Sequence, residues 1–538
     1  MSATLGELLS ASMQRHAERV AIAHEDRAVT YRALHDRAAR LAAALGARGL
    51  RPGDRLASWL TDGIESVDVF VAAALGGFTL VPINHRFRAA EARHVLEDSE
   101  ARGLVFTTTL AQEVDAIAGL DSLPLRIAIG DGERPHDALA LERVLESTAP
   151  LRRPVMRAPE DIAVIGYTSG TTGAPKGALC THRAVTLCTR TVPYVQGMMT
   201  GGACTFVGSF SFVSALWGVL YPHLFTGGRL RLADPADLDG WLDWMERDQA
   251  TYTWLASPLV RAFGRELRRR PKVLAPLRTV VHTGSKVPRE FLEELVDVVG
   301  ERLVETWGLT ESVGPLTATT RADLHALRAS GCEADDLLSS VGRPVPTAEV
   351  ALLDSEGAIH ARPGEEGELV ARADTLFSGY LGHADAVFVH GAASDDRGGR
   401  DHHDEDGAGW FPTGDVGRLD EAGYVYIEDR RKDLIVSGGM NVYPAEVELA
   451  LATLAGVVEC AVFGVPDDRW GETVVAAVVR EPGVALDERA VVDHVRARLA
   501  SYKKPTRVAF LSELPRNASM KVQKQLLRER WPSYVEGD

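Results

Sequence analysis

The stretch IAVIGYTSGTTGAPKG, residues 162–177, decides the fold. An apolar, β-rich run leads directly into a loop with three glycines, four Ser or Thr hydroxyls and Lys176. Glycines let backbone N–H groups approach an anion, hydroxyls add donors, and the lysine adds a mobile positive charge. A Ser/Thr/Gly-rich surface linker would explain neither the preceding strand nor the lysine. The stretch therefore predicts a phosphate site at a strand end; it is not a Walker A loop, since GxxxxGK followed by Ser or Thr is absent.

Helices and strands are expected to alternate on both sides of this loop. The helix-period stretch 30–49 is flanked by short apolar runs such as 54–60 and 76–84, and the same rhythm recurs at 101–108 and 277–284. Continuous apolar strands of this kind are typical of buried parallel sheets, and ligands gather at the ends of such strands. The pattern predicts an α/β fold with mainly parallel sheets packed by helices.

The pattern changes from Gly357 onward. Shorter segments with hairpin signals, 367–373 and 423–430, predict a β-rich subdomain. Two apolar strands and two helices are then expected at the segments 458–467, 472–481, 487–505 and 521–531. We therefore expect a large N-terminal domain of several subdomains, residues 1–430, and a small α+β C-terminal domain, residues 431–538.

Composition excludes several classes of protein. The chain has 538 residues, and 59 basic against 75 acidic side chains give 59 − 75 = −16, so nucleic acid is not an expected partner. The longest apolar run, 69–83, is too short to span a membrane, and the first 20 residues resemble an amphipathic helix and not a signal peptide. We expect a cytoplasmic enzyme without a membrane span. The cysteines form no CxxC pattern and are expected to be reduced, buried thiols: Cys180, Cys188, Cys204, Cys332 and Cys460.

One low-complexity segment, 391–409, is rich in acidic residues and histidine. These residues could bind a metal, but they lack fixed ligand spacing. A solvated surface loop is the preferred interpretation.

Four further motifs follow the phosphate loop in order: ETWGLTES at 305–312, TGD at 413–415, EDRRKDLIVSGGMNVYPAEVE at 428–448 and LPRNASMKVQK at 514–524. Together the five resemble the adenylate-forming superfamily, which includes acyl-CoA synthetases, aryl-CoA ligases, luciferases and adenylation domains of peptide synthetases. The resemblance covers nearly the whole chain. It implies that a carboxylate attacks the α-phosphorus of ATP to give acyl-AMP, that the CoA thiol then attacks the activated carbonyl, and that a mobile C-terminal lid alternates between these half-reactions.

The resemblance also assigns roles to residues. The loop residues expected at the β- and γ-phosphates are Thr168, Ser169, Gly170, Thr171, Thr172, Gly173 and Lys176. Glu311 matches the acidic residue at Mg²⁺, a cation that prefers oxygen ligands, and Thr310 would lie near the α-phosphate. Asp415 resembles the acceptor of the ribose hydroxyls, with Arg430 as its partner for ribose and phosphate.

The C-terminal matches concern motion and chemistry. Lys432 falls at the family's hinge position. Gly438 and Gly439 are expected to line the pantetheine tunnel, because a side chain there would obstruct it. Lys521 matches the lid lysine that reaches the carboxylate and the α-phosphate during adenylation.

The sequence departs from the family pattern at several positions. Ser211 follows Phe210 where the family commonly has a histidine, and the absence of an aspartate there disfavours an amino acid substrate. Trp307 replaces a tyrosine that could donate toward the α-phosphate, and Met520 replaces the glycine before Lys521. Either change could slow adenylation, although a fully active subfamily variant is preferred. The stretch GSKV, 284–287, brings Gly284 and Ser285 to a position near adenine and substrate.

The acyl pocket is expected to be mostly apolar, with Phe210, Ser211, Phe212, Trp217, Trp254, Ser285, Trp307 and Val313 around it and with His282 and Lys286 available for a polar substituent. Such a pocket favours a bulky hydrophobic or aromatic acid. The predicted function is that of an ATP- and Mg²⁺-dependent acyl-CoA ligase.

Four alternatives remain open. The enzyme could chiefly perform thioesterification on acyl-AMP supplied by a partner ligase, or it could load a carrier protein. It could act as a luciferase-like oxygenase, or as a non-catalytic protein that binds acyl-adenylates. A homodimer is compatible with all of them.

Overall fold

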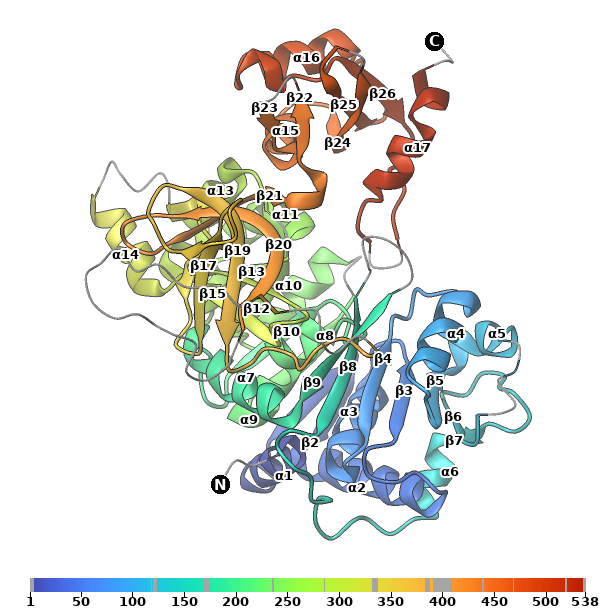
Figure 1. The fold of residues 1–538 in the computed structure, drawn as a ribbon. Coiled ribbons are helices and arrows are strands. Elements are labelled where there is room, and N and C mark those ends of the chain that lie inside the picture. Colours follow the sequence, from blue (N-terminus) through green and yellow to red (C-terminus); the bar gives the residue numbers. More distant parts are fainter. Residues whose placement is uncertain are drawn as a thin grey trace.

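The computed structural model describes residues 4–117, 119, 123–168, 175–234, 237–284, 286–330, 337–382, 388–389, 409–437, 440–467, 469–517 and 520–535. Figure 1 shows a large body that holds the N-terminus and a smaller C-terminal unit that stands above it. The mixed α/β architecture of the prediction is confirmed.

Two large sheets form most of the body. The seven-stranded sheet has the order β7 (Leu139–Ala140), β6 (Arg126–Ile129), β5 (Gly103–Thr107), β3 (Arg55–Trp59), β4 (Thr79–Ile83), β8 (Ile162–Thr168), β9 (Lys176–Thr181). The nine-stranded sheet has the order β16 (Arg343–Pro344), β15 (Gly314–Ala318), β14 (Leu303–Leu309), β13 (Thr279–Thr283), β12 (Tyr252–Ala256), β10 (Ala203–Val207), β11 (Arg229–Ala233), β1 (Val20–His24), β2 (Arg27–Thr30). Neighbouring strands are parallel except at the edges, where β2, β9, β15 and β16 pair antiparallel.

Helices cover these sheets. They are α1 (Leu5–Arg15), α2 (Tyr31–Ala47), α3 (Ile64–Gly76), α4 (Ala89–Asp98), α5 (Ala111–Asp115), α6 (Leu141–Glu146), α7 (His182–Val195), α8 (Val213–Ala215), α9 (Tyr221–Thr226), α10 (Leu238–Arg247), α11 (Val260–Arg268), α12 (Pro271–Leu274), α13 (Arg289–Val299) and α14 (Arg321–Ser330). The expected helix at 30–49 is α2, and Thr30 caps it by accepting a hydrogen bond from the Ala33 N–H. One large apolar core includes side chains from α1, α2, α3 and α7 and from both sheets.

A five-stranded antiparallel sheet follows, as the hairpin signals predicted. Its order is β18 (Ile359–His360), β17 (Ala348–Leu353), β19 (Glu366–Ala373), β20 (Phe411–Leu419), β21 (Val425–Arg430). The longest apolar run of the sequence is divided between α3 and β4, and none of the helices in the described ranges is both long and apolar enough to cross a membrane.

The C-terminal unit has its own sheet and its own apolar cores. Its strands are β23 (Met440–Val442), β22 (Ile435–Ser437), β25 (Gly471–Arg480) and β24 (Val457–Asp467), with β26 (Arg507–Leu511) beside β25. Its helices are α15 (Pro444–Ala452), α16 (Glu488–Arg496) and α17 (Lys524–Val535).

Two predicted helices of this unit are shorter than expected. α16 ends at Arg496. α17 begins at Lys524 and not at Lys521, because the Lys521 backbone N–H donates to the Asn517 side chain at 2.9 Å within a turn. Lys521 therefore lies on a loop that precedes the helix.

The described cysteines carry free thiols. Cys180, Cys188 and Cys204 are buried and Cys460 is half-buried, while Cys332 lies outside the described residues. Burial raises the pKa of each of these four thiols.

Candidate active site

The phosphate loop connects β8 to β9, two antiparallel neighbours in which Thr168 pairs with Lys176. The loop residues Ser169, Gly170, Thr171, Thr172 and Gly173 lie outside the described residues. Thr168 and Lys176 mark the two ends of the loop, and the Lys176 ammonium lies 5.6 Å from the centre of the Tyr380 ring. The lysine is thus held at the carboxyl end of β8, where the sequence predicted an anion site.

Tyr380 links this lysine to Glu311. The Tyr380 hydroxyl donates to Glu311 Oε1 at 2.6 Å, and burial together with this carboxylate raises the pKa of the tyrosine. Tyr380 also forms a β-bridge with Ala178 of β9. Sequence reasoning missed this residue, which joins two predicted phosphate-site groups.

Glu311 sits in a tight turn between β14 and β15. Val313, in the same turn, is fully buried and has a φ of 45°, a left-handed conformation that is strained for a β-branched residue. The Ser312 side chain holds the turn, because its oxygen accepts from the Leu309 N–H at 2.9 Å and lies 2.6 Å from the Gly314 carbonyl. The fold therefore imposes the backbone path that presents Thr310 and Glu311.

Asp415 and Arg430 face each other on β20 and β21. Arg430 Nε lies 2.7 Å from Asp415 Oδ1, and the Trp307 indole N–H donates to Asp415 Oδ2 at 3.0 Å. The carboxylate is only 3% exposed. Burial raises the pKa of Asp415, while Arg430 and the indole oppose that rise. Trp307, expected to line the acyl pocket, instead packs among core residues of the antiparallel sheet and holds Asp415.

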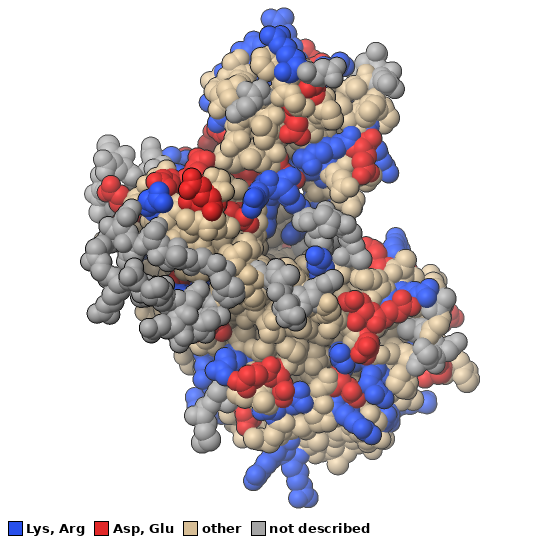
Figure 2. Space-filling model, viewed as in Figure 1, with Lys and Arg blue, Asp and Glu red and all other residues tan. Residues whose placement is uncertain are grey.

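Lys521 reaches this site from the C-terminal unit. Burial lowers the pKa of its ammonium, the neighbouring Arg430 lowers it further, and the charges of Glu311 and Asp415 raise it. The residue before it, Met520, has a φ of 63°, the left-handed conformation in which glycine is favoured. Figure 2 shows Lys and Arg side chains gathered at a notch between the C-terminal unit and the body.

Among the described residues, two hydrogen bonds connect the body to the C-terminal unit across the predicted hinge residue, Lys432. The Ala445 N–H at the start of α15 donates to Asp429 Oδ2 at 2.8 Å, and the Tyr443 hydroxyl donates to Glu366 Oε2 at 2.9 Å. Lys432 itself lies in a short 3₁₀ turn after β21. Gly438 and Gly439, between β22 and β23, lie outside the described residues.

Three polar side chains meet along neighbouring strands: Ser257 directly follows β12, His282 belongs to β13 and Glu305 belongs to β14. His282 Nδ1 lies 2.7 Å from Glu305 Oε2, and its Nε2 lies 3.0 Å from Ser257 Oγ. Glu305 is only 7% exposed, and its other oxygen, Oε1, has no hydrogen-bond partner among the described residues. A buried acceptor of this kind requires a donor from a ligand or from water. The sequence signalled His282, contained Glu305 in the motif at 305–312 without giving it a role, and did not signal Ser257.

His282 does not join the expected acyl pocket. Alternation along β13 places His282 on the same face as Val280, whereas Val281 belongs to the core that contains Phe210. Lys286 lies apart as well, since its ammonium donates to the Ile427 carbonyl at 2.9 Å. Gly284 has a φ of 110°, and Ser285 lies outside the described residues.

The predicted aromatic residues do gather. Phe210, Trp217 and Val313 are buried in one core, and Trp254 packs against it. The Phe210 ring stacks on Phe206 with centroids 5.0 Å apart.

The neighbouring polar positions lie beside this cluster. Phe212 and Ser211 are half-buried, and Ser211 Oγ lies 3.2 Å from Nδ1 of His85, a contact that sequence reasoning missed.

Two family models match the chain. The model of the AMP-binding enzymes matches residues 9–381, and the model of the AMP-binding enzyme C-terminal domain matches residues 446–521.

Curated relatives match along nearly the whole chain. A feruloyl-CoA synthase of Amycolatopsis sp is 33% identical over 97% of this chain and 97% of its own. The long-chain-fatty-acid–CoA ligase FadD13 of Mycobacterium tuberculosis (strain CDC 1551 / Oshkosh) is 33% identical over 94% of each chain. Among solved structures, ATP-bound MatB from Rhodopseudomonas palustris has a TM-score of 0.82 and 27% identity, over 98% of this chain and 99% of its own.

Proposed function

Because the chain belongs to the family of AMP-binding enzymes and is an AMP-forming acid–thiol ligase, we propose that it converts a bulky hydrophobic carboxylic acid into its CoA thioester through an acyl-adenylate. One observation carries the proposal. Lys176 and Glu311 meet through Tyr380, and Lys521 experiences the charges of both Glu311 and Asp415. Groups from the body and from the C-terminal unit thus face one crevice.

The charges of the crevice suit ATP. Lys176, Arg430 and Lys521 supply positive charge for the phosphates. The buried Asp415 carboxylate supplies acceptors for the ribose hydroxyls. Glu305 lies on the same face of β14 as Trp307, the residue that holds Asp415. If the ribose of ATP binds Asp415, the adenine attached to it would reach Glu305 Oε1, the oxygen without a partner among the described residues. The exocyclic amino group of adenine is a donor that matches this acceptor.

Glu311 fits a magnesium site that is completed by the substrate. Mg²⁺ usually binds one or two carboxylates and takes its other ligands from phosphates and water. Glu311 Oε1 accepts from Tyr380, and in this proposal Oε2 binds the metal. Within the described ranges no group of three His, Cys, Asp or Glu side chains could hold a metal alone. When bound, Mg²⁺ would neutralise charge on the leaving pyrophosphate.

In adenylation, a carboxylate oxygen of the acid forms a bond to the α-phosphorus, and the bond to pyrophosphate breaks. In this proposal Lys521 contacts both the acid and the α-phosphate, and its positive charge opposes the charge that develops there. Burial and Arg430 lower its pKa, while Glu311 and Asp415 favour its protonated form. The thioester step requires a different arrangement, since CoA must enter where Lys521 now reaches in.

We propose that residues 431–538 rotate about Lys432 relative to residues 1–430 between the two steps. The bonds from Ala445 to Asp429 and from Tyr443 to Glu366 hold the present arrangement and would break on rotation. Gly438 and Gly439 would then line the path of the pantetheine arm of CoA.

The aromatic cluster supports a hydrophobic acid. Phe206, Phe210 and Trp254 pack together as a group of apolar rings, and the relatives are named for ferulate and long-chain fatty acids. A second candidate, an enzyme that chiefly thioesterifies a supplied acyl-AMP, is favoured by one observation, the left-handed backbone of Met520 beside Lys521.

One experiment tests both candidates. The purified protein is incubated with Mg²⁺, CoA and ferulic, indole-3-acetic or dodecanoic acid, with ATP and separately as the synthetic acyl-AMP, and thioesters are measured by mass spectrometry. Thioester formation from acid and ATP supports the ligase. Turnover of the acyl-AMP alone supports the second candidate, and no thioester in either case refutes both.

A further inference from the structure

A polar network connects the ends of the two large sheets at four side chains that the mechanism above does not use. Ser209 Oγ lies 2.9 Å from Ser211 Oγ and 3.2 Å from His85 Nδ1, and His85 Nδ1 lies 3.2 Å from Ser211 Oγ. Asp62 adjoins Ser209, and its Oδ1 accepts from the Phe210 N–H at 2.9 Å. Asp62 follows β3 and His85 follows β4, whereas the serines follow β10. The network therefore joins segments more than 120 residues apart.

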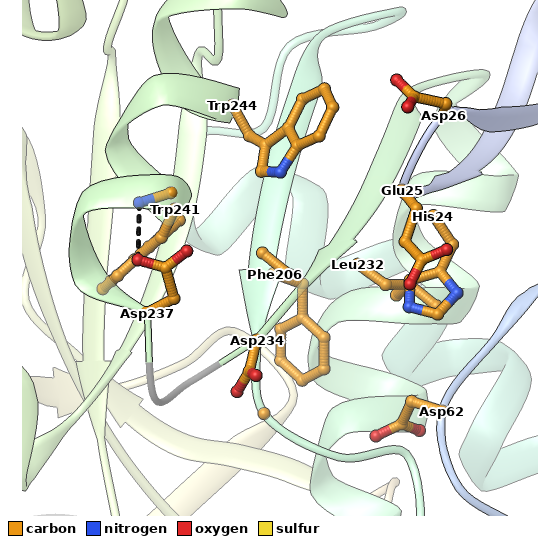
Figure 3. A pocket seen from close by; sticks show the side chains of 13 residues that line it. His24, Glu25, Asp26, Asp62, Phe206, Leu232, Asp234, Asp237, Trp241 and Trp244 are labelled. Carbon is orange, nitrogen blue, oxygen red and sulfur yellow. Dashed lines mark hydrogen bonds between the residues drawn. The ribbon is translucent and has the colours of Figure 1, made fainter.

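The serines of the network lie close in sequence to Val213, whose side chain shares a backbone neighbour with Thr310. A Cβ added at Gly166 of β8 would lie 3.0 Å from Thr310 Cγ2 and 3.2 Å from Val213 Cγ2, so both side chains cover the same backbone. Val213 is two residues from Ser211. Figure 3 shows the Asp62 carboxylate and the Phe206 ring on the wall of one pocket, and the Phe206 ring stacks on Phe210. The network thus contacts the aromatic cluster directly, through the bond from the Phe210 N–H to Asp62, and is two residues from the side chain that neighbours Thr310.

The hydrogen bonds of the network are compatible with the His85 tautomer that carries its hydrogen on Nδ1. A carboxylate is the strongest acceptor in the set, and the Ser209 hydroxyl donates to Asp62. Ser209 Oγ, which also accepts from the Ser211 N–H at 3.2 Å, can then accept from His85 Nδ1–H, and in this tautomer Nε2 presents a lone pair. Burial and the adjacent Arg86 lower the pKa of His85, which keeps the imidazole neutral at neutral pH. A neutral imidazole oriented through a carboxylate has the properties of a general base.

We propose that His85 Nε2 accepts the proton of the CoA thiol in the thioester-forming step, with Ser209 and Asp62 as positioning residues. This inference rests on the proposed function. The thiol sulfur forms a bond to the acyl carbon, the bond from that carbon to the phosphate oxygen breaks, AMP leaves, and the thiol proton moves to His85. A thiol with a pKa near ~8.5 is mostly protonated at neutral pH, so the step needs such an acceptor.

His85→Gln tests the proposal, because it keeps a polar side chain of similar size but removes the base. Each half-reaction is measured alone, adenylation by ATP–pyrophosphate exchange with the accepted acid and thioesterification from its preformed acyl-AMP and CoA. We expect exchange to remain within about threefold of wild type and thioesterification at pH 7 to fall about 100-fold or more. The deficit should shrink toward pH 9.5, where CoA ionises without help.

His35→Gln is the matched control. His35 is also half-buried, also contacts a serine hydroxyl, at 3.0 Å, and also has a pKa lowered by burial, but it lies on α2. Asp62→Asn should slow thioesterification by about tenfold or more, because the Ser209 hydroxyl that contacts His85 loses its charged acceptor.

Equal loss of both half-reactions in His85→Gln, or a deficit that does not change with pH, would overturn the proposal in favour of a structural role. Unchanged thioesterification would overturn it as well. If wild type itself forms no thioester with any probe acid or acyl-AMP, the proposed function fails first, and that outcome is distinct from a defect confined to the variant.

Discussion

The Trp307 indole and the Asp415 carboxylate form one hydrogen-bonded unit, in which Nε1 donates to Oδ2 at 3.0 Å. The other carboxylate oxygen belongs to Arg430. A buried carboxylate needs such donors to remain ionised, since burial by itself favours the protonated form. The tryptophan that departs from the family pattern thus supports the residue we assign to the ribose.

Trp307→Phe should weaken ATP binding. The substitution keeps an aromatic ring but removes one donor from a buried charge, a loss of about 1–2 kcal/mol, so the KM for ATP in pyrophosphate exchange should rise about 5- to 30-fold. Trp241→Phe is the control, because Trp241 is a buried tryptophan whose indole N–H has no partner in the described part of the chain. An unchanged KM in Trp307→Phe would remove the role given to the indole.

Glu305→Gln should change the choice of nucleotide. The glutamine oxygen can keep the bond to His282. The amide N–H₂, a donor, then faces the nucleotide base where wild type has the acceptor Oε1 of Glu305. An amide donor matches O6 of guanine and opposes the amino group of adenine. The ratio of kcat/KM for ATP over GTP should fall at least tenfold, measured by exchange with each nucleotide. A constant ratio would mean that Glu305 does not contact the base.

The sequence predicted the elements better than the contacts. The run 162–168 could be recognised as a strand because its apolar pattern is local, and the α/β fold and the family are confirmed. The assignments of site residues and of the domain boundary stay predictions.

Contacts between distant segments have no local pattern. Tyr380 is 69 residues from Glu311, and His85 is 126 residues from Ser211, so no periodicity or motif spacing pointed to either pair. The face of the sheet on which His282 lies depended on the register of β12, β13 and β14, which is set by tertiary pairing.

Lys521→Ala should separate the two half-reactions. Its ammonium lies among the charges of Asp415, Glu311 and Arg430, so removing it should lower pyrophosphate exchange about 100- to 1,000-fold. Thioesterification of preformed acyl-AMP should remain within about threefold, because we expect the lid to have rotated by then. Lys504→Ala is the control, since that ammonium donates to the nearby backbone carbonyl of Ser501, on the C-terminal unit itself. Comparable loss in both assays would contradict the role of Lys521.

Met520→Gly should relieve strain beside that lysine. A left-handed residue with a side chain costs about 1 kcal/mol, so the variant should adopt the turn more readily and raise the exchange rate several-fold. Met520→Asn, which tolerates the same conformation, should move in the same direction by a smaller amount. A slower exchange in the glycine variant would show instead that the stiff turn helps to present Lys521.

Asp62→Asn should stabilise the protein more at high pH than at low pH. Burial raises the pKa of Asp62 to about 6, from an ordinary value near 3.8 in the unfolded chain. The folded state therefore favours the protonated side chain. This contribution to the free energy of unfolding is complete below pH 3.8 and is lost as the pH rises through about 6. Above that pH the folded protein holds a buried charge that asparagine does not carry, at a cost of up to about 3 kcal/mol.

Urea unfolding at pH 5 and at pH 8 would measure this effect. The excess free energy of unfolding of Asp62→Asn over wild type should be larger at pH 8, while Asp26→Asn, at a position whose side chain is 91% exposed, should show no such trend. A variant that is more stable yet slower in thioesterification would mean that the buried carboxylate is kept for the orientation of His85, at the expense of stability. If the difference in free energy of unfolding between Asp62→Asn and wild type were equal at both pH values, Asp62 would be charged throughout this range. Its burial would then not raise its pKa, contrary to this prediction.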